Sequence, residues 1–205
     1  MSAPATLDRA THTYTDGSVE RVALCVSDVL RLSGICPPYR DIPMVMGFVE
    51  HARELGERVH EWCDYLDNGC DDVESLEGSQ LLPYVLAYRR FCEDHLPEWQ
   101  HIEASFSDSV IGCAGTPDRI GSIKRGKNRT PAIIDIKTPN KAEKHWQIQL
   151  SAYQYLSHRL DCMLFVVHLA SDASYKLRPY ESDIETFLSA TRVAQWRLQN
   201  GAKIR

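Results

Sequence analysis

The sequence predicts an α/β fold in which a mixed central β-sheet is flanked by helices. Two observations predict it: apolar residues recur at helical spacing early in the chain, and short β-branched runs separated by turns follow. The 205 residues suit one domain, 1–205. Within it we expect a mainly helical N-terminal part (1–98), a part with the sheet and a helix (99–180), and a C-terminal helix (181–205).

The predicted N-terminal part contains one strand and three helices. The elements are a short strand and turn (His12–Gly17), a helix capped by Ser27 that runs through Leu32 and ends at Gly34, a long helix (Met44–Leu66) stopped by Asn68-Gly69, and a further helix (Leu81–Phe91). The long helix is the most strongly indicated, because its apolar residues repeat every three or four positions.

The predicted sheet follows these helices. Its strands are Ile102–Phe106, Val110–Ile123, Ala132–Lys137, Met163–Leu169 and Tyr175–Tyr180, with a hairpin turn at Lys124–Arg129. Asn140 followed by Glu143 resembles a capping box and predicts a helix from Lys141 to Leu160. Ser182 is predicted to cap a last helix that runs to Asn200.

The composition excludes several classes of protein. Hydrophobic residues make up 43% and charged residues 25% of the chain, values that argue against a disordered tail or a collagen-like fibre. The longest apolar run, Cys162–Ala170, is far shorter than the roughly 20 residues that cross a bilayer, so no membrane association is expected. Without a recognisable secretory signal, a cytoplasmic location is expected. The seven cysteines are odd in number and lack Cys-x-x-Cys spacing, so free thiols are predicted.

The net charge of −5 conceals a polarised chain. Residues 41–110 hold 16 acidic and 4 basic side chains, whereas residues 119–144 hold 8 basic and 2 acidic ones. The basic part is where a polyanion would bind, and a solvated basic hairpin is the other interpretation.

Two acids and a lysine are the candidate chemical groups. Asp118 lies in Gly115-Thr-Pro-Asp-Arg, and Asp135 and Lys137 lie on the following predicted strand. Residues i and i+2 of a strand share a face, so Asp135 and Lys137 project together with Ile136 buried behind them. If the two strands pair, Asp118 lies beside Asp135, and two adjacent carboxylates favour a cation such as Mg²⁺ between them. A strand-edge ion pair is the alternative interpretation.

With these residues in place, the sequence resembles the PD-(D/E)XK nuclease superfamily, in its RecB-like and phage-type exonuclease branch. Pro117-Asp118 followed by Asp135-Ile136-Lys137 fits the superfamily's motif. The further motifs of the branch match at Gly56 with His60, at Gln149 with Tyr153, and at Glu103, all in the right order. The resemblance covers about residues 12–170 and implies a restriction-endonuclease-like core.

The resemblance implies a role for each matching residue. Asp118, Asp135 and the Ile136 backbone carbonyl would bind the metal, with His60 as an additional ligand. Lys137 would position or activate the attacking water. The implied cofactor is Mg²⁺, and the imidazole suggests that Mn²⁺ also supports activity. 

The remaining matches imply supporting roles. Gln149 and Tyr153 would line the site and touch Lys137 or the nucleic acid, and Glu103 would orient the metal site. Packing in the core is the alternative for the first two, and a sheet-edge charge is the alternative for Glu103. Some nucleases of the branch that this sequence resembles bind an iron–sulfur cluster through cysteines on both sides of the core. No cysteine follows Cys162 here, so we expect no such cluster.

The predicted function is therefore a metal-dependent deoxyribonuclease, most similar to exonucleases of phage recombination or DNA repair. Its expected partners are DNA and, as in some relatives, a single-strand annealing protein; a homo-oligomer is compatible with the resemblance. A non-catalytic nucleic-acid-binding or assembly protein on the same scaffold and a restriction-type endonuclease are the alternatives. The candidate phosphate-binding residues are the four basic side chains of the turn: Lys124, Arg125, Lys127 and Arg129.

Overall fold

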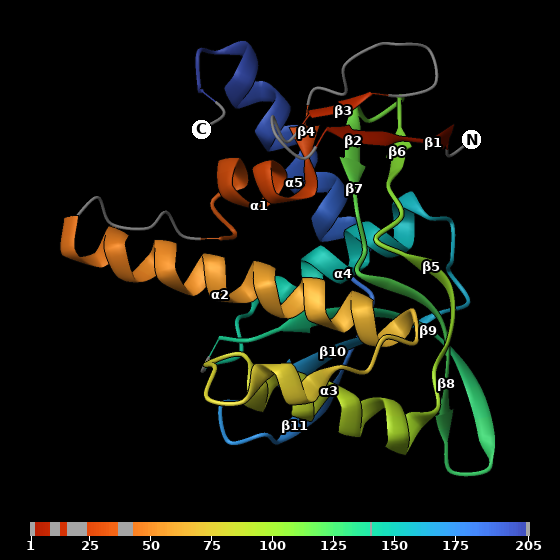
Figure 1. The fold of residues 1–205 in the computed structure, drawn as a ribbon. Coiled ribbons are helices and arrows are strands. Elements are labelled where there is room, and N and C mark those ends of the chain that lie inside the picture. The colour runs from red at the N-terminus through yellow and green to blue at the C-terminus, as the bar shows by residue number, and fades with distance from the viewer. Residues whose placement is uncertain (1–2, 9–12, 16–23, 37–42, 140, 204–205) are drawn as a thin grey trace.

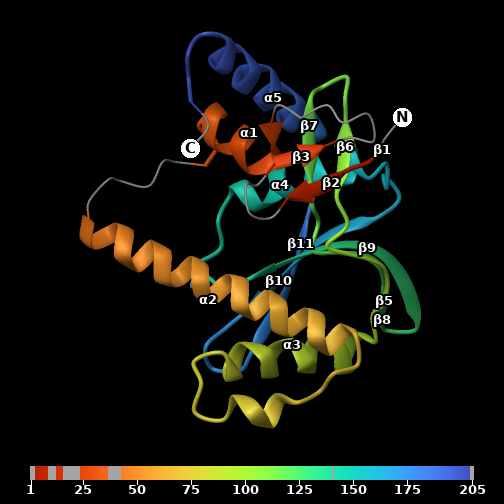
Figure 2. The same cartoon turned by 45° about the horizontal axis from the view of Figure 1, so that its top comes forward.

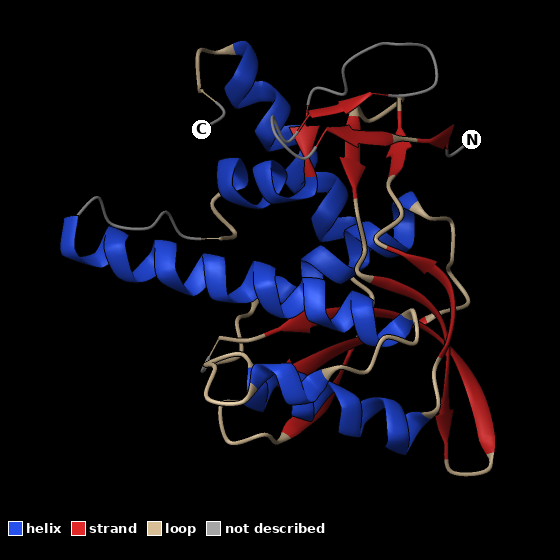
Figure 3. Ribbon diagram, in the orientation of Figure 1, coloured by secondary structure: helices blue, strands red, loops and turns tan. Residues whose placement is uncertain are grey.

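The computed structural model describes residues 3–8, 13–15, 24–36, 43–139 and 141–203. These residues form an α/β fold with a five-stranded mixed sheet flanked by helices, which confirms the predicted fold class (Figure 1, Figure 3). None of the helices described is long and apolar enough to cross a bilayer. All seven cysteines are free thiols, as predicted.

The five-stranded sheet has the order β11-β10-β9-β8-β5. Its strands are β5 (Glu98–Ile102), β8 (Arg119–Arg125), β9 (Asn128–Lys137), β10 (Met163–Leu169) and β11 (Tyr175–Tyr180). β9 and β10 pair in parallel, and every other neighbouring pair is antiparallel. The two parallel strands lie inside the sheet with both faces covered, which explains why their sequences are apolar runs and do not alternate.

Helices cover both faces of this sheet (Figure 2). On one face lie α2 (Pro43–Asp67), the short 3₁₀ helix η1 (Val73–Leu76) and α3 (Leu82–His95); on the other lie α1 (Val26–Ser33), α4 (His145–Leu156) and α5 (Ile184–Gln199). The side chains of successive β9 residues point alternately to the two helical layers. Ile134 and Ile136 pack in the α2–α3 cluster, and Ile133 packs in the cluster with α1, α4 and α5.

Shorter strands form two small sheets. One has the order β1-β6-β7-β4 and the other pairs β2 with β3. These strands are β1 (Ala3–Pro4), β2 (Thr6–Asp8), β3 (Thr13–Thr15), β4 (Leu24–Cys25), β6 (Phe106–Asp108) and β7 (Cys113–Gly115). β7 leads through three residues directly into β8, so the small sheet places Asp118 at the edge of the large one.

The strand region is more divided than the sequence predicts. The predicted strand Val110–Ile123 is two strands, β7 and β8, and the predicted strand Ile102–Phe106 is the end of β5 and the start of β6. Glu103 separates the latter pair with a positive φ of 46°, and Pro117, which has no N–H to donate to a ladder, separates the former. An apolar pattern does not record such breaks.

The helix caps also differ from the predictions. α1 is capped by the Cys25 side chain in place of Ser27, and α5 is capped by Asp183 in place of Ser182. α4 begins at His145, with no side-chain cap, so the capping box predicted at Asn140 and Glu143 does not start it; Asn140 itself lies outside the described residues.

Two other boundaries also depart from the sequence. α4 ends at Leu156, before the predicted Leu160, because His158 takes a positive φ of 54°. The predicted strand and turn at His12–Gly17 falls partly outside the described residues, and β3 accounts for its middle.

Candidate active site

The site forms where β8 and β9 separate. The two strands pair from the hairpin turn up to Arg119 and Ile134, but β9 continues to Lys137 with β10 as its neighbour. Beyond this point none of the described strands pairs with the β8 side of β9. The Asp118 carboxylate takes that place: its Oδ2 accepts a hydrogen bond of 2.6 Å from the Ile136 N–H. The backbone of β9 thus holds the carboxylate at the end of the sheet.

His60 of α2 reaches the same backbone position. Its Nε2 lies 3.1 Å from the Ile136 carbonyl oxygen, and its Nδ1 lies 3.6 Å from Asp118 Oδ1. A carbonyl oxygen only accepts, so Nε2 carries the proton in this arrangement. The imidazole therefore joins a backbone carbonyl and a carboxylate that both come from the edge of the sheet.

Asp135 and Lys137 project from the face of β9 opposite to that of Ile136, as the alternation of side chains along a strand predicts. Lys137 Nζ lies 2.7 Å from Asp135 Oδ2, so the two form an ion pair. The carboxylate is buried, with 1% of the side chain exposed, and within the described residues Lys137 is its charge partner while Oδ2 has no well-aligned hydrogen bond. Burial raises the pKa of Asp135 to about 6, against the opposing effect of Lys137, and the nearby Asp118 carboxylate raises it further.

The chemistry of these residues fits a hard divalent cation. Such an ion prefers oxygen ligands and relieves the repulsion between neighbouring carboxylates. Asp118, Asp135 and the Ile136 carbonyl supply oxygens from two carboxylates and one backbone carbonyl, and within the described residues the buried Asp135 Oδ2 has no well-aligned hydrogen bond. Within the described residues, however, no three His, Cys, Asp or Glu side chains already stand together as a metal-binding group.

Gln149 and Tyr153 face the site from α4. The amide Nε2 of Gln149 donates a 2.9 Å hydrogen bond to the Tyr153 hydroxyl. Burial raises the pKa of Tyr153 well above its usual value, and the charges of Asp135 and Asp118 raise it further, so the hydroxyl stays protonated. Gly115 permits this approach, because a Cβ at that position would lie 3.0 Å from Tyr153 Cε1 and 2.7 Å from Val26 Cγ2.

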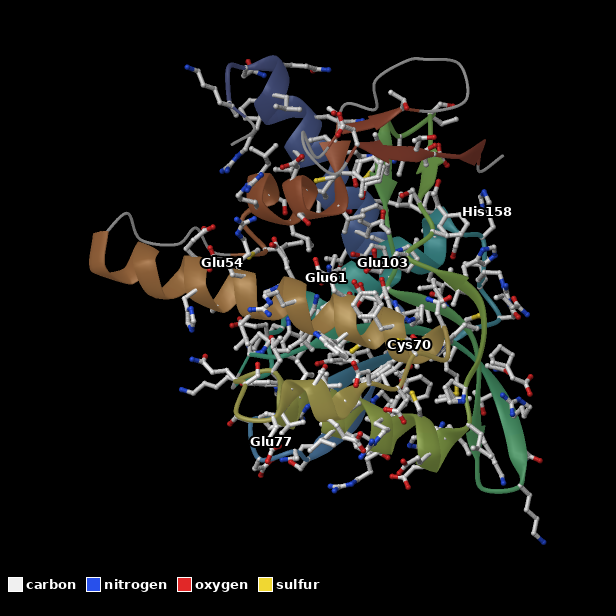
Figure 4. The ribbon with its side chains drawn as sticks, in the orientation of Figure 1. Glu54, Glu61, Cys70, Glu77, Glu103 and His158 are labelled. Carbon is white, nitrogen blue, oxygen red and sulfur yellow. The ribbon has the colours of Figure 1, made fainter. Side chains whose placement is uncertain are left out.

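Glu103 adjoins Asp118 through the backbone. Its N–H donates a 2.9 Å hydrogen bond to the Asp118 carbonyl, and its side chain is half-buried. Figure 4 shows Glu103 after β5, above α2 in that view. The sequence predicted that this glutamate would belong to the site, and the structure makes it a backbone neighbour of the first aspartate.

The basic turn lies at the other end of the β8–β9 hairpin, at the lower right of Figure 1. β8 has seven residues, so at about 3.3 Å per residue the turn is roughly 20 Å from Asp118. Both arginines of the turn already have partners. Arg129 donates to Leu96 O at 2.8 Å and pairs with Glu98 at 3.2 Å, and the Arg125 guanidinium lies 5.2 Å from the centre of the Phe165 ring. Lys124 and Lys127 are exposed.

A buried ion network beneath the site was missed by the sequence analysis. Arg119, fully buried, forms ion pairs with Asp64 at 2.5 Å and Asp67 at 2.6 Å, and donates to the Asp118 carbonyl at 2.7 Å. Both aspartates belong to α2, four and seven residues after His60. This spacing puts all three on one helix face, which is a signal that the sequence contained. The network fixes α2 on the sheet in the register that brings His60 to Ile136.

Comparisons with known proteins add little to this geometry. No protein-family model matches the chain, and a search of curated proteins finds no match. A solved structure described as "Crystal structure of SSO0001" is similar with a TM-score of 0.38 and 16% sequence identity, over 91% of this chain and 81% of that one. A likeness at this level carries no argument about function.

Proposed function

We propose that the protein is a metal-dependent deoxyribonuclease that hydrolyses phosphodiester bonds. One observation carries the proposal: Asp118, the Asp135–Lys137 pair of β9 and the His60 imidazole of α2 come together where two strands of the sheet separate. The buried Asp135 carboxylate has the Lys137 ammonium as its charge partner, but its Oδ2 has no well-aligned hydrogen bond within the described residues, which suits a group that binds a cation.

Each residue takes a role that its position supports. Asp118, Asp135, the Ile136 carbonyl and His60 would hold Mg²⁺ or Mn²⁺. When bound, such an ion supplies Lewis-acid stabilisation of phosphoryl oxygens and favours ionisation of a coordinated water. The Lys137 ammonium, next to Asp135, is placed to orient the attacking water and to stabilise charge on the phosphate. The Tyr153 hydroxyl, which Gln149 holds, is available as a neutral donor at the edge of the site.

The finer assignment depends on the resemblance of the sequence motifs. We infer an exonuclease of phage-type recombination or DNA repair, acting in the cytoplasm on DNA. A single-strand annealing protein and a second copy of the chain are the partners that this assignment suggests. An exonuclease requires a free end, so the topology of the substrate tests this level of the proposal separately from the chemistry.

The test is digestion of end-labelled linear DNA and of covalently closed circular DNA with the same sequence. Each substrate is incubated with Mg²⁺, with Mn²⁺ and with EDTA. The variants are Asp135→Ala and Lys137→Ala, and Lys203→Ala, an exposed lysine after α5, is the matched control. We expect metal-dependent loss of the linear DNA only, reduced by at least about a hundredfold in the first two variants and unchanged in the control.

Other results would revise the proposal at defined levels. Cutting of the circle would assign an endonuclease to the same site. Undiminished cleavage by Lys137→Ala would remove the lysine from the chemistry. If neither DNA is cut with either metal while binding persists, the chain is a nucleic-acid-binding protein on this scaffold.

A further inference from the structure

A row of basic side chains leads away from Lys137 across the sheet. In the strand register Lys137 of β9 pairs with His168 of β10, and His168 pairs with Lys176 of β11. Arg178 lies two residues along β11 from Lys176, so it projects from the same face. All four therefore share the face that carries Asp135. At about 4.8 Å between neighbouring strands, the backbone of Lys176 is roughly 10 Å from that of Lys137.

His168 holds Arg178 in place. The imidazole is buried, with the edge of Trp146 against it at a centroid distance of 5.4 Å. Its Nε2 forms a short contact with the Pro139 carbonyl, which only accepts, so Nε2 carries the proton. Its Nδ1 is then free to accept from Arg178 Nε, 3.3 Å away. This arrangement ties the arginine, through the histidine, to the loop that follows the candidate catalytic lysine.

The Arg178 fork is available for a ligand. Within the described residues it forms no ion pair with a carboxylate, and its hydrogen bond to His168 uses Nε alone. The side chain is half-buried and lines a pocket of about 260 Å³ together with His168, Lys176 and Ser171. The pocket contains one acid, Asp172, and its Oδ1 already accepts from the Ser174 N–H at 3.0 Å and from the Ser174 hydroxyl. The two cations, Arg178 and Lys176, outnumber this single carboxylate, so the pocket keeps a net positive charge that suits an anion.

We infer that Arg178 and Lys176 bind a nucleic-acid phosphate next to the one that is cleaved. The inference extends the proposed function, since it names how the substrate backbone would be held beside Lys137. The planar guanidinium suits two oxygens of a phosphate, and the exposed lysine adds charge at the rim. This surface adjoins the site, whereas the basic turn of β8–β9 lies at the far end of its hairpin.

The test measures binding apart from cleavage. Fluorescence anisotropy of a labelled single-stranded oligonucleotide is recorded over a range of salt concentrations, in EDTA and in Ca²⁺. Arg178→Gln and Lys176→Ala are compared with two controls, Arg192→Gln on the exposed face of α5 and Lys203→Ala, an exposed lysine after α5. Thermal unfolding of each variant shows whether its fold is intact. Oligonucleotides with a 5′-phosphate and with a 5′-hydroxyl separate a terminal phosphate from an internal one.

We expect Arg178→Gln to weaken binding by about tenfold or more, and Lys176→Ala by about threefold. The slope of log K against log salt should fall by about 0.7 for each lost contact on single-stranded DNA, while both controls keep the wild-type slope. A loss confined to the 5′-phosphorylated oligonucleotide identifies a terminal phosphate, and an equal loss on both identifies an internal one; either supports the site.

Unchanged affinity and slope in folded Arg178→Gln and Lys176→Ala would overturn the inference, as would a loss equally large in the controls. Because binding is read without cleavage, these outcomes leave the proposed nuclease intact. Conversely, absence of cleavage by the wild type removes the nuclease while the phosphate site is still decided by the binding data.

Discussion

The buried Asp135 carboxylate makes the stability of the metal-free protein fall with increasing pH. Burial raises the pKa of this group from its usual 3.8 to about 6 in the folded chain, so the folded protein holds a proton that the unfolded chain has already lost. Stability is fully present below pH 3.8 and is lost as the pH rises through about 6. At about 1.4 kcal/mol per pH unit, the ionised carboxylate lowers the free energy of unfolding by about 3 kcal/mol at pH 7.

The prediction concerns the difference between the wild type and Asp135→Asn, because other groups titrate equally in both. Urea unfolding in EDTA between pH 4 and pH 7 should show the variant gaining about 2.4 kcal/mol on the wild type, because part of the effect is already present at pH 4. Asp161→Asn, which removes an exposed carboxylate, is the control and should show no such gain. Mg²⁺ at a hundred times its Kd should restore about 2.7 kcal/mol to the wild type at pH 7 and nothing to Asp135→Asn.

A difference in the free energy of unfolding between Asp135→Asn and the wild type that does not change with pH would contradict the raised pKa of Asp135. The ionised carboxylate would then not destabilise the metal-free protein, and its burial would give no reason to expect a cation beside it. A stabilisation by Mg²⁺ that is equal in both proteins would place the ion elsewhere.

Three other substitutions test separate parts of the structure. Arg119→Met leaves two aspartates of α2 without their cation and should lower the free energy of unfolding by about 3–5 kcal/mol in a chemical denaturation series; a loss under about 1 kcal/mol would contradict the proposed network. Gly115→Ala places a methyl group 3.0 Å from Tyr153, so it should lower the free energy of unfolding by about 1–3 kcal/mol and reduce cleavage. In Gly56→Ala the nearest neighbour of the added methyl group is 3.6 Å away, so this control should be stable and active. Equal behaviour of the two variants would show that close packing at Gly115 does not matter. His60→Ala should weaken Mn²⁺ binding in a calorimetric titration by about tenfold or more, and unchanged affinity would exclude the imidazole as a ligand.

The sequence predicted the elements that have strong periodicity. The long helix was predicted as Met44–Leu66 and is Pro43–Asp67, and β10 and β11 match their predicted limits. In these segments burial alone determines the pattern, so the pattern can be read directly. Helix starts were less accurate, because several polar residues in a row are equally able to cap, and tertiary contacts select among them.

The candidate site was predicted in its residues and only partly in its geometry. The i, i+2 relation of Asp135 and Lys137 follows from strand geometry and is present as an ion pair. The hydrogen bond from the Ile136 N–H to Asp118 was not predictable, because it depends on β8 beginning to pair with β9 only at Arg119, directly after Asp118. The position of the basic turn depends on the same register, which sequence charge alone does not contain.

The hydrogen bond from the Ile136 N–H to a carboxylate, in place of a neighbouring strand among the described residues, makes this backbone amide a natural reporter of the site. In a complete sheet this amide would sense only its neighbouring strand. Here its proton points to a carboxylate oxygen at a short distance, which shifts the amide resonance downfield. Any event that turns or neutralises the Asp118 carboxylate therefore changes the signal of a residue whose own side chain is buried in the core. Magnetic resonance of the unmodified protein can follow a cation or a proton arriving at that oxygen, without a substitution or an attached label.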